Sequence, residues 1–384
     1  MKKGWQTKSL WDVLEIQNGY AFDSKGFNPA KGMPLIRIRS LKKGMETETF
    51  FDGDYEDKYV VKAGDLLVGM DGEFGCYEWK GDPALLNQRV CRLQGFSGEL
   101  APRFLFYGVN DYLKAIEDVT GYATVKHLSS KQILNIKFPV PPLAEQRRIV
   151  SILDEAFDVI ATAKVNAEKN LKNARALFES HVQAVFSRQG AGYSLKTFSD
   201  VCEISSALVD PRRKEYLDLL HVGGANIATK TGELIELKTA REEGLISGKF
   251  VFDTTMVLYS KIRPYLMKVA RPDFRGLCSA DIYPLSVKSG QLNRDYLFHL
   301  LLSPGFTDYA NAGSARAGMP KVNRDHLFAY RVSLPSVSTQ KQLAAELDAL
   351  HQETQKLESI YQRKLAALDE LKQSLLHQAF SGAL

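Results

Sequence analysis

Residues 141–154, PPLAEQRRIVSILD, open a segment that recurs later in the chain. When residues 143–187 are shifted by 194 positions, they align with residues 337–381 without a gap. The aligned landmarks are Gln146 with Gln340, Ile149 with Leu343, Leu153-Asp154 with Leu347-Asp348, Leu177 with Leu371, and Phe186-Ser187 with Phe380-Ser381. A chance match of this length that also preserves polar residues is a poor explanation, so the chain contains an internal repeat.

The repeat continues upstream with small shifts, since DVLEI at residues 12–16 resembles DVCEI at residues 200–204. The order is therefore a globular piece, a long helix, a second globular piece and a second long helix. We expect domains at residues 1–142 and 189–335, and helices at residues 143–188 and 336–384. Pro141 and Pro142 mark the start of the first helix, and Ser336 or Ser338 is the expected N-cap of the second.

Both helical segments show a heptad pattern, in which apolar residues alternate at steps of four and three. In the first segment the seam is Ile149, Leu153, Ala156, Ile160, Ala163, Ala167, Asn170, Ala174, Leu177, His181 and Ala184. In the second it is Leu343, Leu347, Leu350, Thr354, Leu357, Tyr361, Lys364, Leu368, Leu371, Leu375 and Gln378. One seam is mostly small and the other mostly large, which favours close packing of the two helices as an antiparallel coiled coil.

Three seam positions are polar: Asn170, Thr354 and Lys364. Such residues fix register in some coiled coils. The alternative is that they are tolerated polar positions near solvent.

The globular pieces contain short strand-like runs broken by glycine and proline, such as DLLVG at residues 65–69 and TMVLYS at residues 255–260. Helical stretches follow at residues 103–118 and 294–302. This mixture predicts a fold of two tandem α+β domains.

Composition excludes several classes of protein. No apolar run approaches the ~20 residues that span a bilayer, and the start of the chain lacks the apolar core of a signal peptide. The four cysteines form no CxxC pair and the seven histidines no HExxH motif, so we expect reduced thiols in a cytoplasmic protein and no metal site. The net charge of +5 is too small to identify a nucleic-acid binder by itself, so any DNA-binding surface must be local.

No P-loop, dinucleotide-binding glycine motif, GxSxG elbow or methyltransferase motif is present, so we expect no catalytic residues. Asp71 and Glu73 have the chemistry for Mg²⁺, although a solvated loop is the simpler interpretation. With catalysis excluded, we expect the protein to bind a ligand. Its loops are rich in cations, amides and hydroxyls, which suit phosphates and base edges. The candidates are Arg37, Arg39, Asn87, Gln88, Arg89, Thr124, Lys126, His127, Ser260, Lys261, Arg263, Lys268, Ser314, Arg316, Lys321 and Arg324.

This layout resembles the specificity subunits of Type I restriction-modification systems (HsdS). The likeness rests on residues 141–154, close to the family's PPLxEQRxIVxxLD junction, on the helix ends near residues 177–180 and 378–382, on GDLLV at residues 64–68 and on NGYAF at residues 18–22. It covers essentially the whole chain. The second junction, PSVSTQKQL at residues 335–343, lacks the Glu-Gln-Arg core, which implies that contacts to one partner differ.

The resemblance implies a non-catalytic DNA-reading subunit in which each domain reads one half of a bipartite site and the helices set the gap. Two modification subunits would methylate adenine with S-adenosylmethionine, and two restriction subunits would use ATP and Mg²⁺. We expect the helices to dock the modification subunits. The residues expected to form the spacer and this docking surface are Glu145, Gln146, Arg147, Ile149, Leu153, Leu177, Phe186, Gln340, Leu343, Leu347, Leu371 and Phe380.

Two other functions compete with this one. An enzyme with its site in one globular piece lacks any recognisable motif. A coiled-coil scaffold whose globular pieces bind proteins is the stronger alternative, and it predicts no sequence-selective DNA binding.

Overall fold

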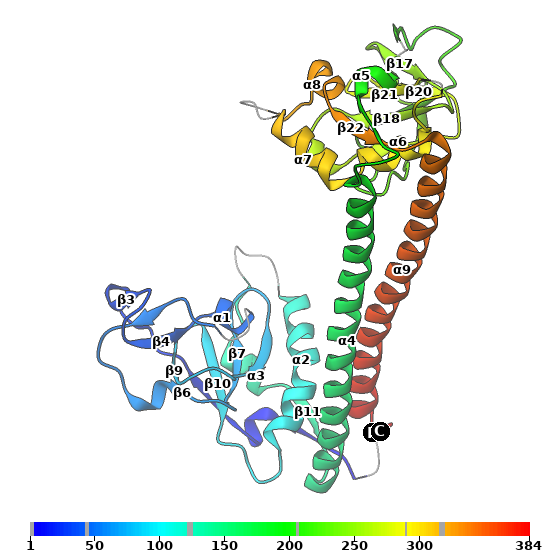
Figure 1. The fold of residues 1–384 in the computed structure, drawn as a ribbon. Coiled ribbons are helices and arrows are strands. Elements are labelled where there is room, and N and C mark those ends of the chain that lie inside the picture. The colour runs from blue at the N-terminus through cyan, green and yellow to red at the C-terminus, as the bar shows by residue number, and fades with distance from the viewer. Residues whose placement is uncertain (1–3, 43–45, 121–125, 205–206, 289, 315–318) are drawn as a thin grey trace. The chain divides into compact units, whose positions relative to one another are not determined.

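The computed structural model describes residues 4–42, 46–120, 126–204, 207–288, 290–314 and 319–384 (Figure 1). The chain divides into two compact units. The first unit comprises residues 1–166 with 365–384, and the second comprises residues 167–364. Both long helices, α4 (Leu143–Phe186) and α9 (Val337–Ser381), therefore contribute one end to each unit.

In its described residues, the first unit contains three small sheets and three α-helices ahead of α4. Its α-helices are α1 (Ile38–Lys42), α2 (Pro102–Val119) and α3 (Ser130–Leu134), and short 3-10 turns occupy Leu10–Asp12, Ser24–Gly26 and Asp57–Tyr59. Its strands are β1 (Gln6–Ser9), β2 (Glu15–Asn18), β3 (Phe27–Asn28), β4 (Met33–Ile36), β5 (Phe50–Phe51), β6 (Val60–Val61), β7 (Leu66–Gly69), β8 (Gly75–Glu78), β9 (Ala84–Leu86), β10 (Val90–Gln94) and β11 (Lys137–Val140).

The second unit has the same kinds of element between α4 and α9. Its helices are α5 (Phe198–Val201), α6 (Arg294–Leu301), α7 (Pro304–Ala312) and α8 (Arg324–Phe328), with a 3-10 turn at Pro264–Leu266. Its strands are β12 (Ser194–Thr197), β13 (Cys202–Glu203), β14 (Leu208–Val209), β15 (Leu220–Val222), β16 (Lys238–Thr239), β17 (Lys249–Phe252), β18 (Met256–Ser260), β19 (Val269–Ala270), β20 (Gly276–Ser279), β21 (Ile282–Val287) and β22 (Arg331–Leu334).

Sheet topology repeats between the units. The four-stranded sheet has the order β2-β10-β7-β8 in the first unit and β13-β21-β18-β19 in the second. Each unit also pairs its first strand with its last, as β1-β11 and β12-β22, and each has a five-stranded sheet with one parallel pair, β4-β9 or β15-β20. The predicted α+β class and internal repeat are confirmed.

The core of the first unit lies between its four-stranded sheet, α2 and the ends of the long helices. Phe104 of α2 is fully buried and packs against Phe138 and Phe380, with ring centroids 5.9 and 4.9 Å away. Gly108 lies against the same α9 ring, since a Cβ atom there would sit 2.3 Å from Phe380 Cε1. The C-terminal helix is thus part of the hydrophobic core of the N-terminal domain.

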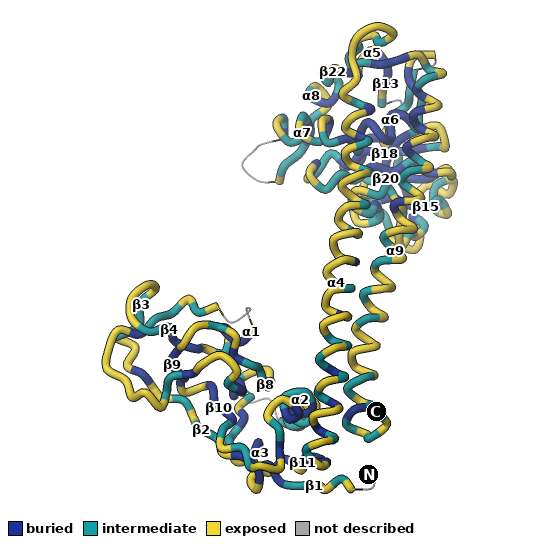
Figure 2. Tube along the Cα trace, turned by 60° about the horizontal axis from the view of Figure 1, so that its bottom comes forward, coloured by how far each residue is buried: buried dark blue, intermediate teal, exposed yellow. Residues whose placement is uncertain are grey.

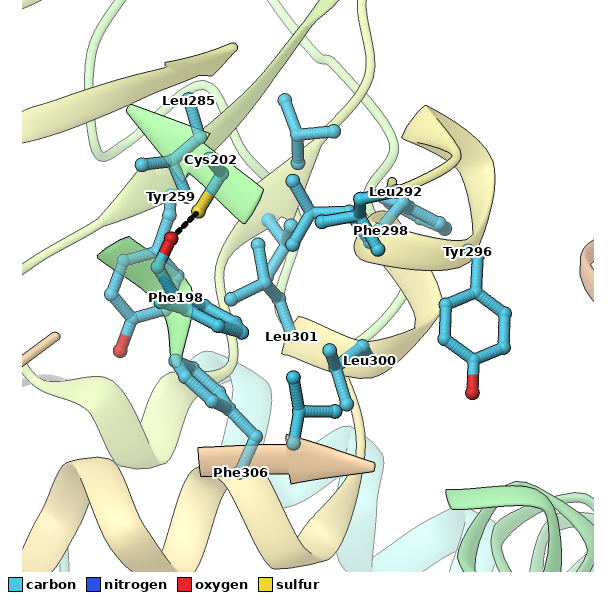
Figure 3. Close-up of a cluster of buried hydrophobic side chains, with 14 of the residues drawn as sticks. Phe198, Cys202, Tyr259, Leu285, Leu292, Tyr296, Phe298, Leu300, Leu301 and Phe306 are labelled. Atoms are coloured by element: carbon cyan, nitrogen blue, oxygen red, sulfur yellow. Dashed lines mark hydrogen bonds between the residues drawn. The ribbon is translucent and has the colours of Figure 1, made fainter. Parts of the chain in front are cut away.

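The core of the second unit uses the opposite ends of the same helices. Figure 3 shows Phe198, Tyr259 and Phe306 of this core lying close together, with the Cys202 thiol donating to the Phe198 carbonyl. Tyr296 of α6 packs against Phe186 at the end of α4, with ring centroids 5.0 Å apart. This pairing reproduces that of Phe104 with Phe380 at the equivalent place in the repeat.

Contacts between the two helices show that α4 and α9 run antiparallel in each unit. In the first unit Arg148 donates to the carbonyl of Leu384 (2.8 Å) and Lys164 pairs with Asp369 (2.7 Å), so residue numbers rise along one helix as they fall along the other. In the second unit, Arg175 pairs with Glu358 (2.9 Å) and His181 with Glu346 (3.1 Å) in the same sense. The predicted antiparallel packing is confirmed.

The predicted seam is wrong at every second position in the later part of each helix. Asn170, Leu177 and Ala184 of α4 are exposed, and the residues that face inward instead are Leu171, Phe178 and Val185. On α9 the exposed positions are Leu357, Lys364 and Leu371, and the partly buried residues in their place include Glu358 and Leu365. The reason is that a straight helix has 3.6 residues per turn and drifts by ~20° per heptad from a 3.5-residue pattern.

The structure also shows where the three polar residues of the predicted seam lie. Thr354 is buried, and its hydroxyl donates to the Leu350 carbonyl of its own helix (2.8 Å). Asn170 and Lys364 are exposed, so they do not set the register. Exposed residues, yellow in Figure 2, run along both long helices.

The start of α9 is capped as expected, because Ser336 Oγ accepts a hydrogen bond from the Thr339 N–H (3.2 Å). Across the described part of the chain, no helix has the length and apolar composition of a membrane span.

Candidate nucleic-acid interface

Three segments of the first unit converge at one end of its four-stranded sheet. They are residues 70–72 after β7, residues 87–89 before β10 and residues 126–128 before α3, here called the first platform. Backbone hydrogen bonds join them: Met70 N–H to Arg89 O (3.0 Å), Gly72 N–H to Lys126 O (3.0 Å) and Leu128 N–H to Met70 O (2.8 Å). Asp71 also forms a β-bridge with His127. The platform is therefore fixed by main-chain bonds whatever side chains it carries.

The side chains of the first platform are organised around the Asp71 carboxylate. Asp71 Oδ1 lies 2.6 Å from His127 Nδ1, and Oδ2 lies 3.3 Å from Arg89 Nε. Asp71 itself is mostly covered, whereas the side chains of Arg89 and His127 are about half exposed. Because the carboxylate is more buried than the two basic side chains it contacts, it orients them toward the surface.

The second unit builds the same platform from residues 261–263, 279–281 and 320–322, here called the second platform. The bonds are Lys261 N–H to Asp281 O (3.0 Å), Arg263 N–H to Pro320 O (2.9 Å) and Val322 N–H to Lys261 O (2.8 Å). Ile262 forms a β-bridge with Lys321. Each of these contacts has a counterpart in the first platform, so the two surfaces are structural repeats.

The second platform has a carboxylate too, but on a different segment. Asp281 Oδ1 lies 3.4 Å from Lys261 Nζ and 3.8 Å from Lys321 Nζ. Asp281 occupies the place of Arg89, whereas Asp71 occupies the place of Ile262. The same backbone therefore presents a different arrangement of charge in each unit.

A cavity of about 360 Å³ adjoins the second platform. Its lining includes Lys261, Tyr283, Lys321, Asn323 and Arg324. Tyr283 lies between two cations, with its ring centroid 5.2 Å from Lys261 Nζ and 5.9 Å from the Arg324 guanidinium carbon. Burial lowers the pKa of Lys261, and the neighbouring Lys321 lowers it further. The three cations that line this hollow make it attractive to a phosphate group.

The remaining candidates of the first domain vary in their accessibility. Arg37 and Arg39 are exposed at the start of α1, and Gln88 is exposed next to Arg89. Asn87 is almost buried, and its side-chain oxygen accepts a hydrogen bond from the Gln88 N–H (2.9 Å). Lys126 donates to the carbonyl of Glu117 (2.7 Å).

The remaining candidates of the second domain are less accessible, apart from Arg263, which is exposed. Ser260 and Ser314 are buried and donate to the carbonyls of Ile262 and Asn311. Lys268 donates to the carbonyl of Gly224. Arg263 lies on the second platform with a left-handed backbone (φ 50°).

Two further candidates, Thr124 and Arg316, lie outside the described residues.

Sequence reasoning missed the roles of Asp71, Asp281 and Tyr283. The sequence predicts a solvated loop, or a Mg²⁺ site, at Asp71 and Glu73, whereas in the structure the Asp71 carboxylate contacts the side chains of Arg89 and His127. Among the described residues, no group of three or more His, Cys, Asp or Glu side chains is arranged to hold a metal ion. Extending the repeat alignment through residues 70–72 and 261–263 would have shown that these two loops are equivalent.

The repeated glutamines of the long helices anchor each helix to its own domain. Gln146 and Gln340 are both fully buried. Gln146 accepts from the Ala101 N–H (2.8 Å) and donates to the carbonyls of Glu99 and Pro141 (both 2.7 Å). Gln340 makes the same three bonds, accepting from the Asn293 N–H and donating to the carbonyls of Gln291 and Pro335. The second junction keeps this anchor although it lacks the Glu-Gln-Arg core.

About two turns further along each helix, an aspartate makes a second anchor. Asp154 accepts hydrogen bonds from Arg103 Nε (2.8 Å) and from the Tyr107 hydroxyl, and the bond from Arg103 lowers the pKa of Asp154.

Asp348 is held by Arg271 and by His299 Nε2 (2.8 Å). Burial alone would raise the pKa of Asp348, but the hydrogen bonds from His299 and Arg271 outweigh it and lower the value to about 2.

The other residues expected on the spacer and docking surface fall into two groups. Ile149, Leu153, Leu343 and Leu347 are buried in the domain cores, and Phe186 and Phe380 pack against those cores. Glu145, Arg147, Leu177 and Leu371 remain at the surface, with Glu145 paired to Arg148 (2.7 Å). Leu177 and Leu371, equivalent in the repeat, are 67% and 46% exposed.

Two α+β units of one topology, each with a basic platform and each fixed to both long helices, define a tandem recognition protein. A family model described as the Type I restriction modification DNA specificity domain matches residues 2–173 and again residues 192–364. The chain belongs to this family, the specificity subunits of Type I restriction-modification systems. It is the DNA-specificity component of such a system and not its catalytic part.

Curated relatives agree with this assignment. The EcoDI specificity subunit of Escherichia coli is 26% identical over 99% of this chain and 88% of that protein. The EcoBI specificity subunit of Escherichia coli is 42% identical, but over only 43% of this chain and 35% of that protein. The MjaVIII specificity subunit of Methanocaldococcus jannaschii is 22% identical over 99% of this chain and 94% of that protein.

Solved structures show the same fold. A chain from a study of complex assembly and conformational transition of the type I R-M system has a TM-score of 0.73 at 17% identity, covering 100% of this chain and 99% of its own. The HsdS subunit from Thermoanaerobacter tengcongensis has a TM-score of 0.60 at 18% identity, covering 100% of this chain and 98% of its own.

Proposed function

We propose that the two globular domains, residues 1–142 and 189–335, each read one half of a bipartite DNA site. The observation that carries this proposal is the repeated platform, which the same backbone bonds build twice in one chain. A scaffold built only to hold proteins together has no need of two matched basic surfaces. The family, described by DNA specificity, also favours DNA over the scaffold alternative.

The difference in charge between the platforms supports reading of two different half-sites. The first presents Arg89 and His127 around Asp71, and the second presents Lys261 and Lys321 around Asp281. Side chains at equivalent positions that differ in charge and length recognise different base edges. The target is therefore expected to be asymmetric, with two unlike specified blocks.

In this proposal the long helices, at residues 143–188 and 336–384, set the gap between the half-sites and dock two modification subunits. These adenine-N6 methyltransferase subunits would bind S-adenosylmethionine and take the flipped adenine into their own pockets. Leu177 and Leu371 are the candidate docking residues of this chain, because large exposed apolar side chains at equivalent places suit two copies of one partner. Two restriction subunits would supply the ATP- and Mg²⁺-dependent nuclease, and the complex would act in the cytoplasm.

A genome-wide map of N6-methyladenine, made with and without this gene, tests the proposal. We expect one split motif, two short specified blocks around an unspecified gap, to lose methylation when the gene is deleted. An unchanged map in a strain whose purified complex contains this chain and an active methyltransferase subunit would overturn the proposal.

A further inference from the structure

We propose that Arg89 reads a guanine in the half-site of the first domain and that Asp71 positions it for this contact. The inference rests on the proposed function and adds the base class that one platform recognises. It assigns Arg89 the base contact and Asp71 a supporting role through Arg89.

The geometry of the pair suits this contact. Asp71 Oδ2 lies 3.3 Å from Nε of Arg89, so the ion pair is made at the inner edge of the guanidinium. Among the described residues, neither Nη1 nor Nη2 of Arg89 donates a hydrogen bond to the protein. Those two groups form the fork that donates to O6 and N7 of guanine, the commonest specific contact in the major groove. The Arg89 side chain is 55% exposed, so the fork is accessible.

The carboxylate is itself held in place. Asp71 Oδ1 is bonded to His127 Nδ1 at 2.6 Å, and the Met70 N–H and Gly72 N–H on either side of Asp71 are tied to the other two segments of the platform. A flexible arginine loses side-chain entropy when it binds, and a fixed partner at Nε reduces that loss. A pre-organised Arg89 favours hydrogen bonds whose strength depends on direction, such as those to a guanine edge.

The charge around Arg89 favours a base over a phosphate. A phosphate that approached Arg89 would also approach the Asp71 carboxylate, and like charges repel. A guanine edge is neutral and presents two acceptors, so the carboxylate opposes it far less. The second platform shows the contrast, because its hollow brings Lys261, Lys321 and Arg324 together, with Asp281 near the two lysines.

The test uses the complex of this chain with its methyltransferase partner and DNA duplexes that vary one base pair of the first half-site at a time. For the wild type, replacing one guanine by 7-deazaguanine, which lacks the N7 acceptor, is expected to lower the methylation rate by about 10-fold. Arg89→Lys is expected to cause a similar loss and to respond less to the same replacement, because one ammonium group does not reproduce the fork. The lysine keeps the positive charge but loses the fork, so a simple phosphate contact would survive it.

Asp71→Asn keeps the side-chain size and removes the charge that holds Arg89. We expect it to weaken discrimination at the same base pair and to leave the other positions unchanged. Arg331→Lys, an exposed arginine of β22 outside both platforms, is the matched control and is expected to keep full selectivity.

Selectivity is a ratio of rates on two duplexes, so it does not depend on how much of a variant folds. A wild-type complex that methylates no split site would overturn the proposed function. If the split site is found, the proposed function stands and the Arg89 assignment is tested alone. It would be overturned if Arg89→Lys kept its selectivity at every guanine, or if no guanine of the first half-site responded to the 7-deaza replacement.

Discussion

Replacing Gln146 by alanine tests whether one buried amide fixes the long helix to the first unit. The side chain is fully buried and makes three hydrogen bonds to the main chain, at 2.7–2.8 Å. Each bond contributes about 1 kcal/mol net, and backbone groups left unpaired add to the cost. We therefore expect Gln146→Ala to lower the free energy of unfolding of the first unit by about 3 kcal/mol.

Tryptophan fluorescence can report on the first unit in this experiment. Its three tryptophans, Trp5, Trp11 and Trp79, all lie in the first unit. Urea unfolding followed by tryptophan fluorescence therefore reports on that unit, while hydrogen exchange measured on peptides covers both.

Gln340→Ala is the matched variant, because Gln340 makes the same three bonds in the second unit. We expect it to increase hydrogen exchange in residues 290–347 and to leave the tryptophan transition nearly unchanged. Gln183→Ala, at an exposed position of α4, is the control and should change stability by less than about 0.5 kcal/mol. A loss below about 1 kcal/mol for Gln146→Ala would refute the anchoring role of the buried amide.

Three further perturbations follow from the packing and the charges. Gly108→Ala should destabilise the first unit by about 1–3 kcal/mol in the same urea assay, since the new methyl group would meet the ring of Phe380; an unchanged midpoint would show that the ring moves aside at no cost. The pKa of Asp348 is lower folded than unfolded, so its ion pairs stabilise the protein above pH ~4 and this contribution is lost as the pH falls toward 2. Thermal melts of wild type and Asp348→Asn should therefore differ most above pH ~4 and converge as the pH falls below about 2, and a constant difference would contradict the assignment. Leu177→Glu and Leu371→Glu should each weaken binding of a methyltransferase subunit at least 10-fold by titration calorimetry without changing the melting temperature, and undiminished binding would place docking elsewhere.

The long helices were predictable because their signal is periodic and occurs twice. Gln146 and Gln340 are aligned polar residues in the repeat, and the structure shows that each one makes equivalent hydrogen bonds to its own domain. The predicted seam is wrong beyond the first half of each helix, and the reason is geometric. A heptad template has a period of 3.5 residues, so it moves off a straight helix and assigns Leu177 and Leu371 to the interface although both are exposed.

The platforms were only partly predictable. Arg89 and Lys261 could be selected as basic residues in loops, but the carboxylates that organise them are not at equivalent positions. Main-chain hydrogen bonds between distant segments create the equivalence, and such bonds leave no pattern in side-chain types. Two-residue strands such as β14 (Leu208–Val209) are likewise too short to show alternation.

The most direct test of the central claim, that two separate domains each read one half of a split site, is an exchange of residues 1–142. This segment would be replaced by the corresponding domain of another specificity subunit, and N6-methyladenine would be mapped by single-molecule sequencing. The account predicts that one block of the methylated motif changes while the other block and the gap stay the same. A change in both blocks, or in neither, would contradict it.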